Sequence, residues 1–419
     1  MTFNTRTRVK TPDRGRSLRV AYIMSRFPKL TETFVLYEML AVERLGVQVE
    51  VYPLLRQREA AVHDDARPLV ERAHYHPFIS IPIILAQFSF LFRRPGAYCR
   101  TWWEVLSGTW GSWNFFIGAL GIFPKAVRFA YEMERQGIDH VHAHFANHPA
   151  VAALVIHRLT GIPFSFTAHA HDLHVERRML GAKVRASKFA VTVSEFNRRI
   201  MLEECDPPSG SKVRVIHCGV DPDAFANDRR PEPDRPLEIV CVAALRELKG
   251  HRYLIDACQR LLERGVSFRC HLIGDGPLRP QIESQIASSN LQHCVFVHGG
   301  LTRPDVMATL AASDVAVLAS VKTSSGRWEG IPVALMEAMA AGLPVVASAT
   351  SGIPELVQDG RSGTLVPPED AVAIADALEL MARDRTRAAQ MGAAGRERVL
   401  RDFNQHASAL ELAKLFAVT

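Results

Sequence analysis

Short apolar runs alternate with segments of helical spacing along most of the chain. The runs that predict buried strands lie at 19–24, 47–52, 138–142, 163–167, 189–193, 213–216, 237–243, 268–273, 294–297, 314–319 and 343–347. Between many of them, apolar residues three or four positions apart predict helices at 32–45, 124–136, 252–264, 278–288 and 333–341. This alternation is typical of parallel sheets with helices on both faces.

A proline- and charge-rich stretch near the middle of the chain divides the pattern in two. We expect a linker over 218–236, a first domain over 18–217 and a second domain over 237–402. At 419 residues the chain is long enough for two such cores. The fold class is therefore α/β with two doubly wound, Rossmann-like domains, and their ligands are expected in the cleft between them.

The two ends of the chain fall outside this alternation. The first 17 residues are rich in arginine, and no apolar stretch follows them as a secretion signal requires, so they predict a flexible basic arm. The last segment, 403–419, carries a helical pattern and is expected to pack back on the first domain.

An apolar insertion near 78–123 departs from the alternation. Residues 78–92 are almost wholly apolar, Arg93 and Arg94 follow, and four of the five tryptophans come next, at 102, 103, 110 and 113. The apolar run is too short to cross a bilayer comfortably. Two interpretations stay open: a helix that lies in the membrane interface, or a buried helical insertion.

Composition narrows the class of protein only slightly. The apolar content of 47% and the charged content of 22% are those of a globular protein. The net charge of +6 fits anionic lipid, phosphorylated substrates or nucleic acid, and charge alone does not choose among them. The seven cysteines are scattered and form no CxxC pair, which favours a reducing cytoplasm over a disulfide framework or a zinc site.

The strongest chemical feature is the stretch from Trp328 to Met339, which follows the strand at 314–319. Pro332 suits the first turn of a helix, and Gly330 lets backbone approach a ligand. The start of that helix, with Gly330, Ile331, Pro332 and Val333, is expected to bind a diphosphate. Glu329 precedes the helix and is expected to reach a sugar. Glu337 lies inside an otherwise apolar helix, needs a partner there, and is expected to accept hydrogen bonds from a ribose.

Two further groups stand at predicted strand ends of the second half. Arg246 and Lys249 follow the first strand there and are expected to bracket a diphosphate and to stabilise charge on a leaving nucleoside diphosphate. Gly274 and Gly276 close another strand at the same edge. Taken alone, either group is also compatible with ordinary surface structure.

In the first half, His169 and Asp172 follow the strand at 163–167. A histidine at this place can hydrogen-bond a sugar hydroxyl. The histidines at 140, 142, 144 and 148 suggest a metal, yet no acidic cluster accompanies them in the sequence, so we predict no metal site. The DxD formed by Asp221 and Asp223 lies in the linker and is discounted as a metal ligand.

Several well-known motifs are absent from the sequence: GxxxxGK, GxGxxG after the first strand, GxSxG and HExxH. Kinase, dehydrogenase, hydrolase and metalloprotease functions therefore lose their usual sequence support.

The pair Glu329 and Glu337, with seven residues between them, resembles the E-x7-E motif of retaining glycosyltransferase family 4, which has the GT-B fold. The resemblance extends to Arg246 and Lys249, to GDGPL, CGVDPDAF and SGIPELVQDGRSGTLVPPED, and covers most of 138–370. The segments SRFPKLTETFVLYEM and FTAHAHDL resemble the branch that serves exopolysaccharide or colanic-acid-type assembly.

The resemblance implies roles for the residues named above. Glu329 would contact the transferred sugar, Glu337 the ribose, Arg246 and Lys249 the diphosphate, and His169 the sugar from the other domain. It also implies retention of anomeric configuration without a metal ion or other cofactor. The loop with Thr31, Glu32 and Thr33 stands where many relatives have a glycine-rich loop, and it is expected to shape the acceptor side together with Asp172.

We therefore predict transfer of a hexose from a nucleoside-diphosphate sugar to a glycan or lipid-linked glycan in bacterial exopolysaccharide synthesis. The expected location is the cytoplasm, at the inner face of the cell membrane, with no nucleic-acid partner. A nucleotide-sugar isomerase of the 2-epimerase type, which would release free nucleotide-sugar without an acceptor, is the alternative enzyme. A glycan-binding scaffold without turnover is a third hypothesis.

Overall fold

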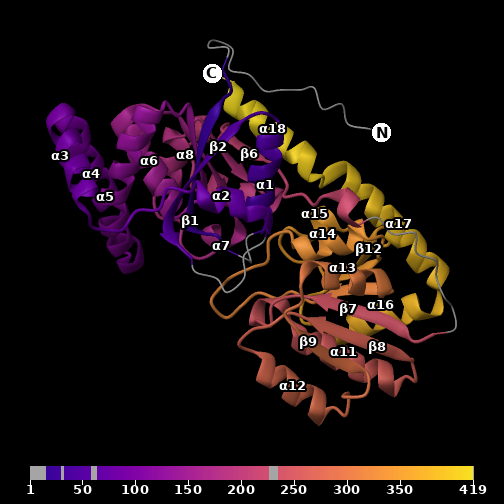
Figure 1. The fold of residues 1–419 in the computed structure, drawn as a ribbon. Coiled ribbons are helices and arrows are strands. Elements are labelled where there is room, and N and C mark those ends of the chain that lie inside the picture. The colour runs from indigo at the N-terminus through magenta and orange to yellow at the C-terminus, as the bar shows by residue number, and fades with distance from the viewer. Residues whose placement is uncertain (1–15, 30–32, 58–63, 226–234, 419) are drawn as a thin grey trace. The chain divides into compact units, whose positions relative to one another are not determined.

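The computed structural model describes residues 16–29, 33–57, 64–225 and 235–418, which belong to two compact units. Unit 1 consists of Met1–Ile216 with His406–Thr419, and unit 2 of His217–Gln405. Each is built on a parallel sheet with helices packed against it, which confirms the predicted α/β class (Figure 1). The predicted basic arm falls almost wholly outside the described residues.

Unit 1 follows the predicted alternation of strands and helices. Its strands are β1 (Arg19–Phe27), β2 (Gln48–Arg56), β3 (His140–His144), β4 (Phe164–Ala168), β5 (Phe189–Thr192) and β6 (Val213–Val215). Its helices are α1 (Thr33–Arg44), η1 (Asp64–Ala66), α2 (Arg67–Glu71), α3 (Ile81–Arg93), α4 (Pro95–Thr109), α5 (Trp113–Gln136), α6 (His148–Thr160), α7 (Ala170–Leu173), α8 (Leu180–Ala186), α9 (Glu195–Glu203), α10 (Pro207–Gly210) and α18 (Gln405–Ala417).

The strands of unit 1 pair in the order β2-β1-β3-β4-β5-β6, all parallel. Side chains of β1 alternate between two apolar clusters, because successive residues of a strand point to opposite faces. Ala21 and Ile23 pack with α5 and α6, whereas Val20 and Tyr22 pack with α1 and α18. The sheet is thus buried on both faces, as a parallel sheet requires.

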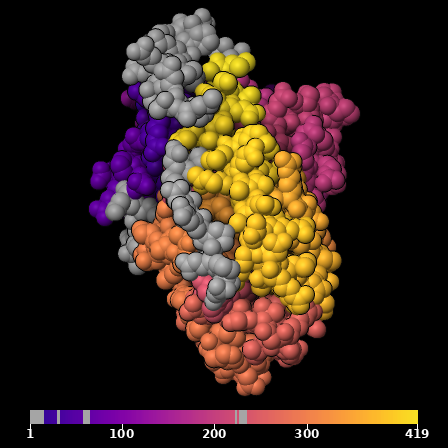
Figure 2. All heavy atoms as spheres, turned by 90° about the vertical axis from the view of Figure 1, so that its right-hand side faces the viewer, coloured from indigo at the N-terminus to yellow at the C-terminus, as the bar shows by residue number. Residues whose placement is uncertain are grey.

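The C-terminal helix α18 contributes to the core of unit 1 although it follows unit 2 in the sequence. Leu412, Ala413 and Phe416 are buried in the same apolar cluster as β1. The Phe416 ring lies 6.3 Å from the Tyr22 ring and 5.2 Å from the His142 ring. The outer surfaces of α17 and α18 are visible in yellow in Figure 2.

The helices of the apolar insertion extend further than the sequence pattern suggests. α5 begins at Trp113 and continues through Pro124, so the helix predicted at 124–136 is only its second half. Phe123 and Ala126, on either side of the proline, are fully or almost fully buried. This tertiary packing holds the helix continuous through a residue that in isolation disfavours it.

Unit 2 contains a second parallel sheet. Its strands are β7 (Leu237–Val242), β8 (Phe268–Ile273), β9 (Val295–Gly299), β10 (Val315–Leu318), β11 (Val345–Ser348) and β12 (Gly363–Val366). Its helices are η2 (Pro222–Phe225), η3 (Glu247–Lys249), α11 (His251–Glu263), α12 (Arg279–Ser288), α13 (Arg303–Ala312), α14 (Val333–Ala340), α15 (Ile353–Leu356), α16 (Ala371–Arg383) and α17 (Arg385–Asp402).

Two features of unit 2 differ from the sequence prediction. Strand β12 was not predicted, because this edge strand is only half-buried at its centre and Gly-Thr-Leu-Val lacks the continuous apolar run of β10 and β11; its pairing with β11 establishes it. Part of the predicted linker belongs to unit 2, since Val220 and Phe225 are buried in the core of that unit. Residues 226–234 of the linker lie outside the described residues.

Candidate functional site

The strand order of unit 2 brings two loops together at one edge of the sheet. In the order β12-β11-β10-β7-β8-β9, the first strand of the unit, β7, lies between β8 and β10. The loops that leave the carboxyl ends of β7 and β10 therefore flank a topological switch point, where open α/β sheets bind ligands. Arg246 and Lys249 lie on the first loop and Glu329 on the second.

Lys249 and Glu329 join these two loops directly. Lys249 Nζ lies 2.5 Å from Glu329 Oε2, and Ser320 Oγ donates to the same oxygen at 3.4 Å. Ser351 Oγ donates a hydrogen bond to the backbone carbonyl of Glu329. The carboxylate is therefore held by Lys249 from the loop after β7 and by Ser320 from its own loop, while Ser351, after β11, holds the backbone of Glu329. The sequence analysis does not single out Ser320 or Ser351, although Ser351 begins the SGIPEL segment.

Arg246 contrasts with Lys249 in its surroundings. Its side chain is exposed, and within the described residues no carboxylate lies in ion-pairing distance of it. The neighbouring Glu247 is occupied, because its carboxylate accepts from the backbone N–H of Ser324 at 2.8 Å. The Arg246 guanidinium is thus available to an anion at the switch point.

Glu337 is a half-buried carboxylate on α14. Burial raises its pKa to about 7, and the charge of Arg303 only partly opposes that effect. In the described part of the chain no side chain or backbone group hydrogen-bonds to its carboxylate. The partner that the sequence analysis expected for Glu337 is therefore not supplied by these residues.

The residues that precede α14 bring backbone groups to the edge of the sheet. Helix α14 begins at Val333, as predicted, and Pro332 is its N-cap and not a residue of its first turn. Ile331 and Pro332 are buried, and Gly330 is half-buried. Helices leave their first N–H groups without intrahelical acceptors, so this end is suited to an anionic ligand.

Glycines allow the loops at this edge to pack closely. Gly250 has φ +62°, and a Cβ there would overlap the carbonyl oxygen of Ala319 at the end of β10. A Cβ at Gly274 or Gly276 would likewise collide with the carbonyl of Ala243 or Leu245. These contacts give Gly274 and Gly276 a packing role; their contact with a ligand stays a prediction.

Replacing Gly250 with alanine is expected to destabilise unit 2 strongly. The added Cβ must displace the backbone beside Ser320, and forcing extra volume into packed structure costs about 1–3 kcal/mol. Gly265→Ala is the matched control, because Gly265 has φ +70° but nothing within 4 Å of its added Cβ. Thermal unfolding should give a lower Tm for Gly250→Ala than for the control, by about 2–4 °C per kcal/mol. Equal Tm values for the two variants would contradict the close approach of Gly250 to the carbonyl oxygen of Ala319.

In unit 1, His169 and Asp172 join the ends of β3 and β4. Asp172 Oδ1 accepts from the backbone N–H of His169 at 2.9 Å, and Oδ2 accepts from that of Ala146. Burial raises the pKa of Asp172 to about 7 and lowers that of Lys183 to about 7. Because both oxygens of Asp172 are engaged with backbone, the structure gives it a role in holding these loops; acceptor binding stays a prediction.

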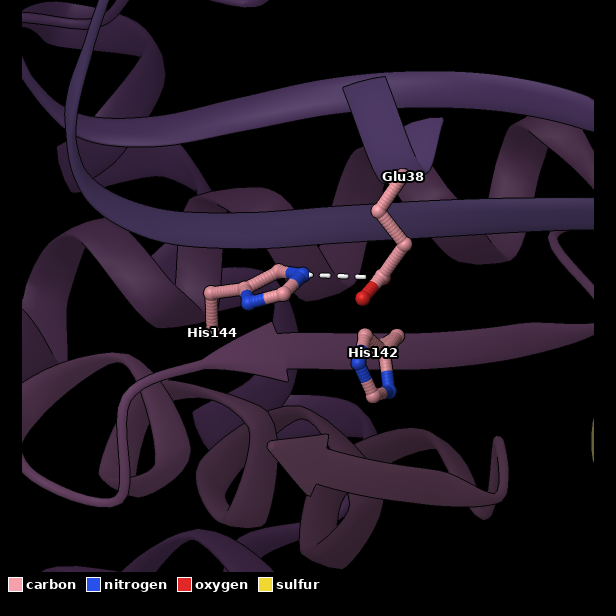
Figure 3. A group of neighbouring side chains, drawn as sticks. All are labelled: Glu38, His142 and His144. Atoms are coloured by element: carbon pink, nitrogen blue, oxygen red, sulfur yellow. Dashed lines mark hydrogen bonds and ion pairs between the residues drawn. The ribbon is translucent and has the colours of Figure 1, made fainter. Parts of the chain in front are cut away.

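A chain of hydrogen bonds leads from His169 into the sheet. His144 Nδ1 lies 3.4 Å from His169 Nε2, and His144 Nε2 lies 3.0 Å from Glu38 Oε1, as Figure 3 shows for the second contact. Tyr22 donates to the same Glu38 oxygen at 3.2 Å. Burial holds the pKa of His169 well below its usual range. His169 is therefore a neutral imidazole, oriented by His144.

The sequence shows no acidic cluster beside the histidines, but the tertiary structure brings one acidic residue, Glu38, to them. Glu38 lies with His142 and His144, and one ligand atom from each falls within 4.8 Å of the others (Figure 3). Spacing did not reveal it, because Glu38 comes from α1, far away in the sequence. His142, however, binds Ser165 Oγ at 2.8 Å and Thr167 Oγ1 at 3.0 Å through its two nitrogens. Hydrogen bonds thus account for these side chains, and the absence of a metal site stays a prediction.

The remaining acceptor-side residues are only partly described. Thr31 and Glu32 lie outside the described residues, and Thr33 is the first residue of α1. Their expected contact with an acceptor stays a prediction.

Comparisons with known proteins agree with this arrangement. Residues 224–398 match the family model "Glycosyl transferases group 1", and residues 105–224 match "Glycosyltransferase Family 4". The chain is 32% identical to a protein of Escherichia coli K12 named as the colanic acid biosynthesis glycosyltransferase WcaL, over 95% of this chain and 99% of that protein. It is 39% identical to the amylovoran biosynthesis glycosyltransferase AmsK of Erwinia amylovora, over 49% of this chain and 50% of AmsK.

Solved structures show the same fold. A glycosyltransferase from Rickettsia africae superposes with a TM-score of 0.72 at 18% identity, covering 96% of this chain and 98% of that one. Anabaena Alr3699/HepE in complex with UDP superposes with a TM-score of 0.68 at 16% identity, covering 95% and 99%. With two parallel-sheet units of GT-B type and family matches over both halves, the chain belongs to glycosyltransferase family 4.

Proposed function

We propose that this glycosyltransferase moves a hexose from a nucleoside-diphosphate sugar to a glycan or lipid-linked glycan in bacterial exopolysaccharide synthesis. The names of WcaL and AmsK support the pathway, and the complex of HepE with UDP-glucose supports the class of donor. The reaction retains the anomeric configuration, needs no metal ion, and takes place in the cytoplasm at the inner face of the cell membrane.

The observation that carries the donor assignment is the contrast among the charged groups at the switch point of unit 2. Arg246 is exposed without an ion-pair partner among the described residues, and Lys249 is held in place by Glu329. Two cations at the carboxyl edge, beside the first turn of α14, match the charge of a diphosphate. Glu337 accepts hydrogen bonds from the ribose, which supplies the partner that the described residues leave out.

The sugar is the part of the donor assigned to Glu329, with Gly330, Ile331, Pro332 and Val333 beside it. In the transfer, the bond from the anomeric carbon to the diphosphate oxygen breaks and a bond to the acceptor hydroxyl oxygen forms. The acceptor proton passes to a diphosphate oxygen on the same face, which accounts for retention. Arg246 and Lys249 stabilise the charge on the departing diphosphate. For His169 we propose contact with the transferred sugar, as the family resemblance implies.

Product analysis tests this function. The purified protein is incubated with UDP-, GDP- and ADP-hexoses and a glycan acceptor, in the presence of a chelator. We expect one donor base to give free nucleoside diphosphate in step with a glycoside whose anomeric proton shows the donor configuration by NMR. An inverted product, a requirement for added metal, or a changed free nucleotide-sugar formed without acceptor would each refute a stated part of the proposal.

A further inference from the structure

Exposed apolar side chains gather on the helical insertion of unit 1. Of the eighteen large hydrophobic side chains that are exposed in the described residues, twelve lie between residues 78 and 120. They are Phe78, Ile79, Ile81, Ile84, Leu85, Phe88, Phe92, Trp103, Trp110, Trp113, Ile117 and Leu120. We call this set the insertion surface. Single exposed apolar residues are ordinary, whereas a cluster of this size marks an interaction site.

Helix α3 is apolar on two opposite sides. Ile83, Ala86 and Phe90 form its buried stripe. Ile81, Leu85, Phe88 and Phe92 repeat at similar helical spacing and are 50–78% exposed. A helix at a water-facing surface normally carries polar residues on its outer side, so the apolar outer side of α3 is unsuited to contact with water.

Helices α4 and α5 carry further exposed apolar side chains of the insertion. The two helices pack with α3 and α6 beside the sheet of unit 1 (Figure 1). On α5, Trp113, Ile117 and Leu120 form an exposed stripe, and the Phe78 ring lies over Gly121 of that helix. Trp103 and Trp110 are 73% and 71% exposed. Three exposed indoles suit the boundary between lipid and water, where Trp is favoured.

The charges of the insertion are those of a surface for anionic lipid. Residues 78–123 contain three arginines, Arg93, Arg94 and Arg100, and one acidic residue, Glu104. Glu104 forms an ion pair with Arg158 at 3.0 Å, and Arg93 and Arg94 share Glu134 at 3.1 and 2.8 Å. These paired groups together keep one net positive charge, and the exposed Arg100 adds a second. Basic residues beside apolar and indole side chains bind anionic lipid head groups.

Helix length decides how such a surface meets a bilayer. Among the described residues, no helix has the length and apolar character that crossing a membrane requires. The 13 residues of α3 rise only about 20 Å, against about 30 Å for the hydrocarbon core. A helix of this kind lies in the plane of the interface.

We infer that the insertion surface is a membrane-binding face that seats α3 and the exposed indoles in the interface of an anionic phospholipid bilayer. The inference rests on the proposed function only in that a lipid-linked acceptor gives this face its use. It resolves the two interpretations of the insertion: one side of α3 is core, and the other side contacts lipid.

Vesicle flotation with the full chain tests this inference. Wild type is expected to float with vesicles of phosphatidylcholine and phosphatidylglycerol, more weakly with phosphatidylcholine alone, and with a blue shift of tryptophan emission. Leu85→Glu is expected to weaken partition about tenfold or more, because it replaces the proposed apolar contact with lipid by a charge. Leu380→Glu on α16 is the matched control, since Leu380 is 64% exposed and Leu85 is 62% exposed.

Three results would contradict the inference that the insertion surface binds a membrane. They are absence of flotation by wild type, equal partition of the two variants, and a wild-type dimer that Leu85→Glu converts to a monomer without any binding to vesicles. Sugar transfer to a water-soluble acceptor is measured in parallel and should be unchanged in Leu85→Glu. Loss of transfer in every sample, wild type included, would instead count against the proposed function.

Discussion

Replacing Glu329 with glutamine is expected to slow sugar transfer by about 100- to 1,000-fold, the effect of removing one preorganised electrostatic group. Glutamine keeps the size of the side chain but removes the charge that holds Lys249 Nζ at 2.5 Å. Lys249 then loses its fixed position beside the proposed diphosphate. Initial rates of nucleoside-diphosphate release, measured at several donor concentrations, separate the effect on kcat from that on KM.

A double-mutant cycle shows whether Lys249 and Glu329 act as one unit. The double variant Lys249→Met, Glu329→Gln should lose little more than either single variant, because residues in direct contact are not additive. Asp376→Asn is the control, since its ion pair with Arg264 at 2.7 Å is largely exposed and joins α16, which follows the edge strand β12, to the C-terminal end of α11. Normal transfer by a folded Glu329→Gln protein would show that the site is assigned wrongly.

Replacing Glu337 with glutamine is expected to stabilise the ligand-free protein at pH 8. The folded-state pKa of about 7 lies above the ordinary value of 4.5, so the folded protein binds this proton more tightly than the unfolded chain does. The wild type therefore loses stability as the pH rises from about 4.5 to about 7, and glutamine avoids that loss. The pKa difference corresponds to at most about 3 kcal/mol.

Thermal unfolding of both proteins between pH 5 and pH 8 measures this effect. The Tm advantage of Glu337→Gln should be small at pH 5 and should reach its maximum above pH 7, at about 2–4 °C per kcal/mol. Asp172, whose pKa burial also raises to about 7, is present in both proteins, so the difference isolates Glu337. Added nucleoside diphosphate should raise the Tm of wild type more than that of the variant. If the variant is less stable than wild type at pH 8, the conclusion that the Glu337 carboxylate lacks a hydrogen-bond partner is wrong.

The local pattern of the sequence was sufficient for eleven of the twelve described strands and for their assembly into two parallel-sheet units. Strand β8 begins and ends where the sequence predicts, because its buried Phe268, Cys270 and Leu272 alternate with the more polar Arg269 and His271. The placement of Arg246, Lys249 and Glu329 at one edge of the sheet was also predictable, since each follows a strand; their role in donor binding stays a proposal. The carboxyl ends of parallel strands meet at one edge, so spacing along the chain carries this information.

Contacts between distant segments were decided only by the tertiary structure. The sequence alone does not state that β7 lies between β8 and β10, and this order is what brings Lys249 to Glu329. Glu38 reaches His144, and Ser351 reaches the Glu329 carbonyl, across separations that no local periodicity encodes. The apolar run at 78–92 likewise predicts a hydrophobic segment but does not show which of its residues face the core. Only packing against the core of unit 1 determines which side of α3 is buried and which is left for another partner.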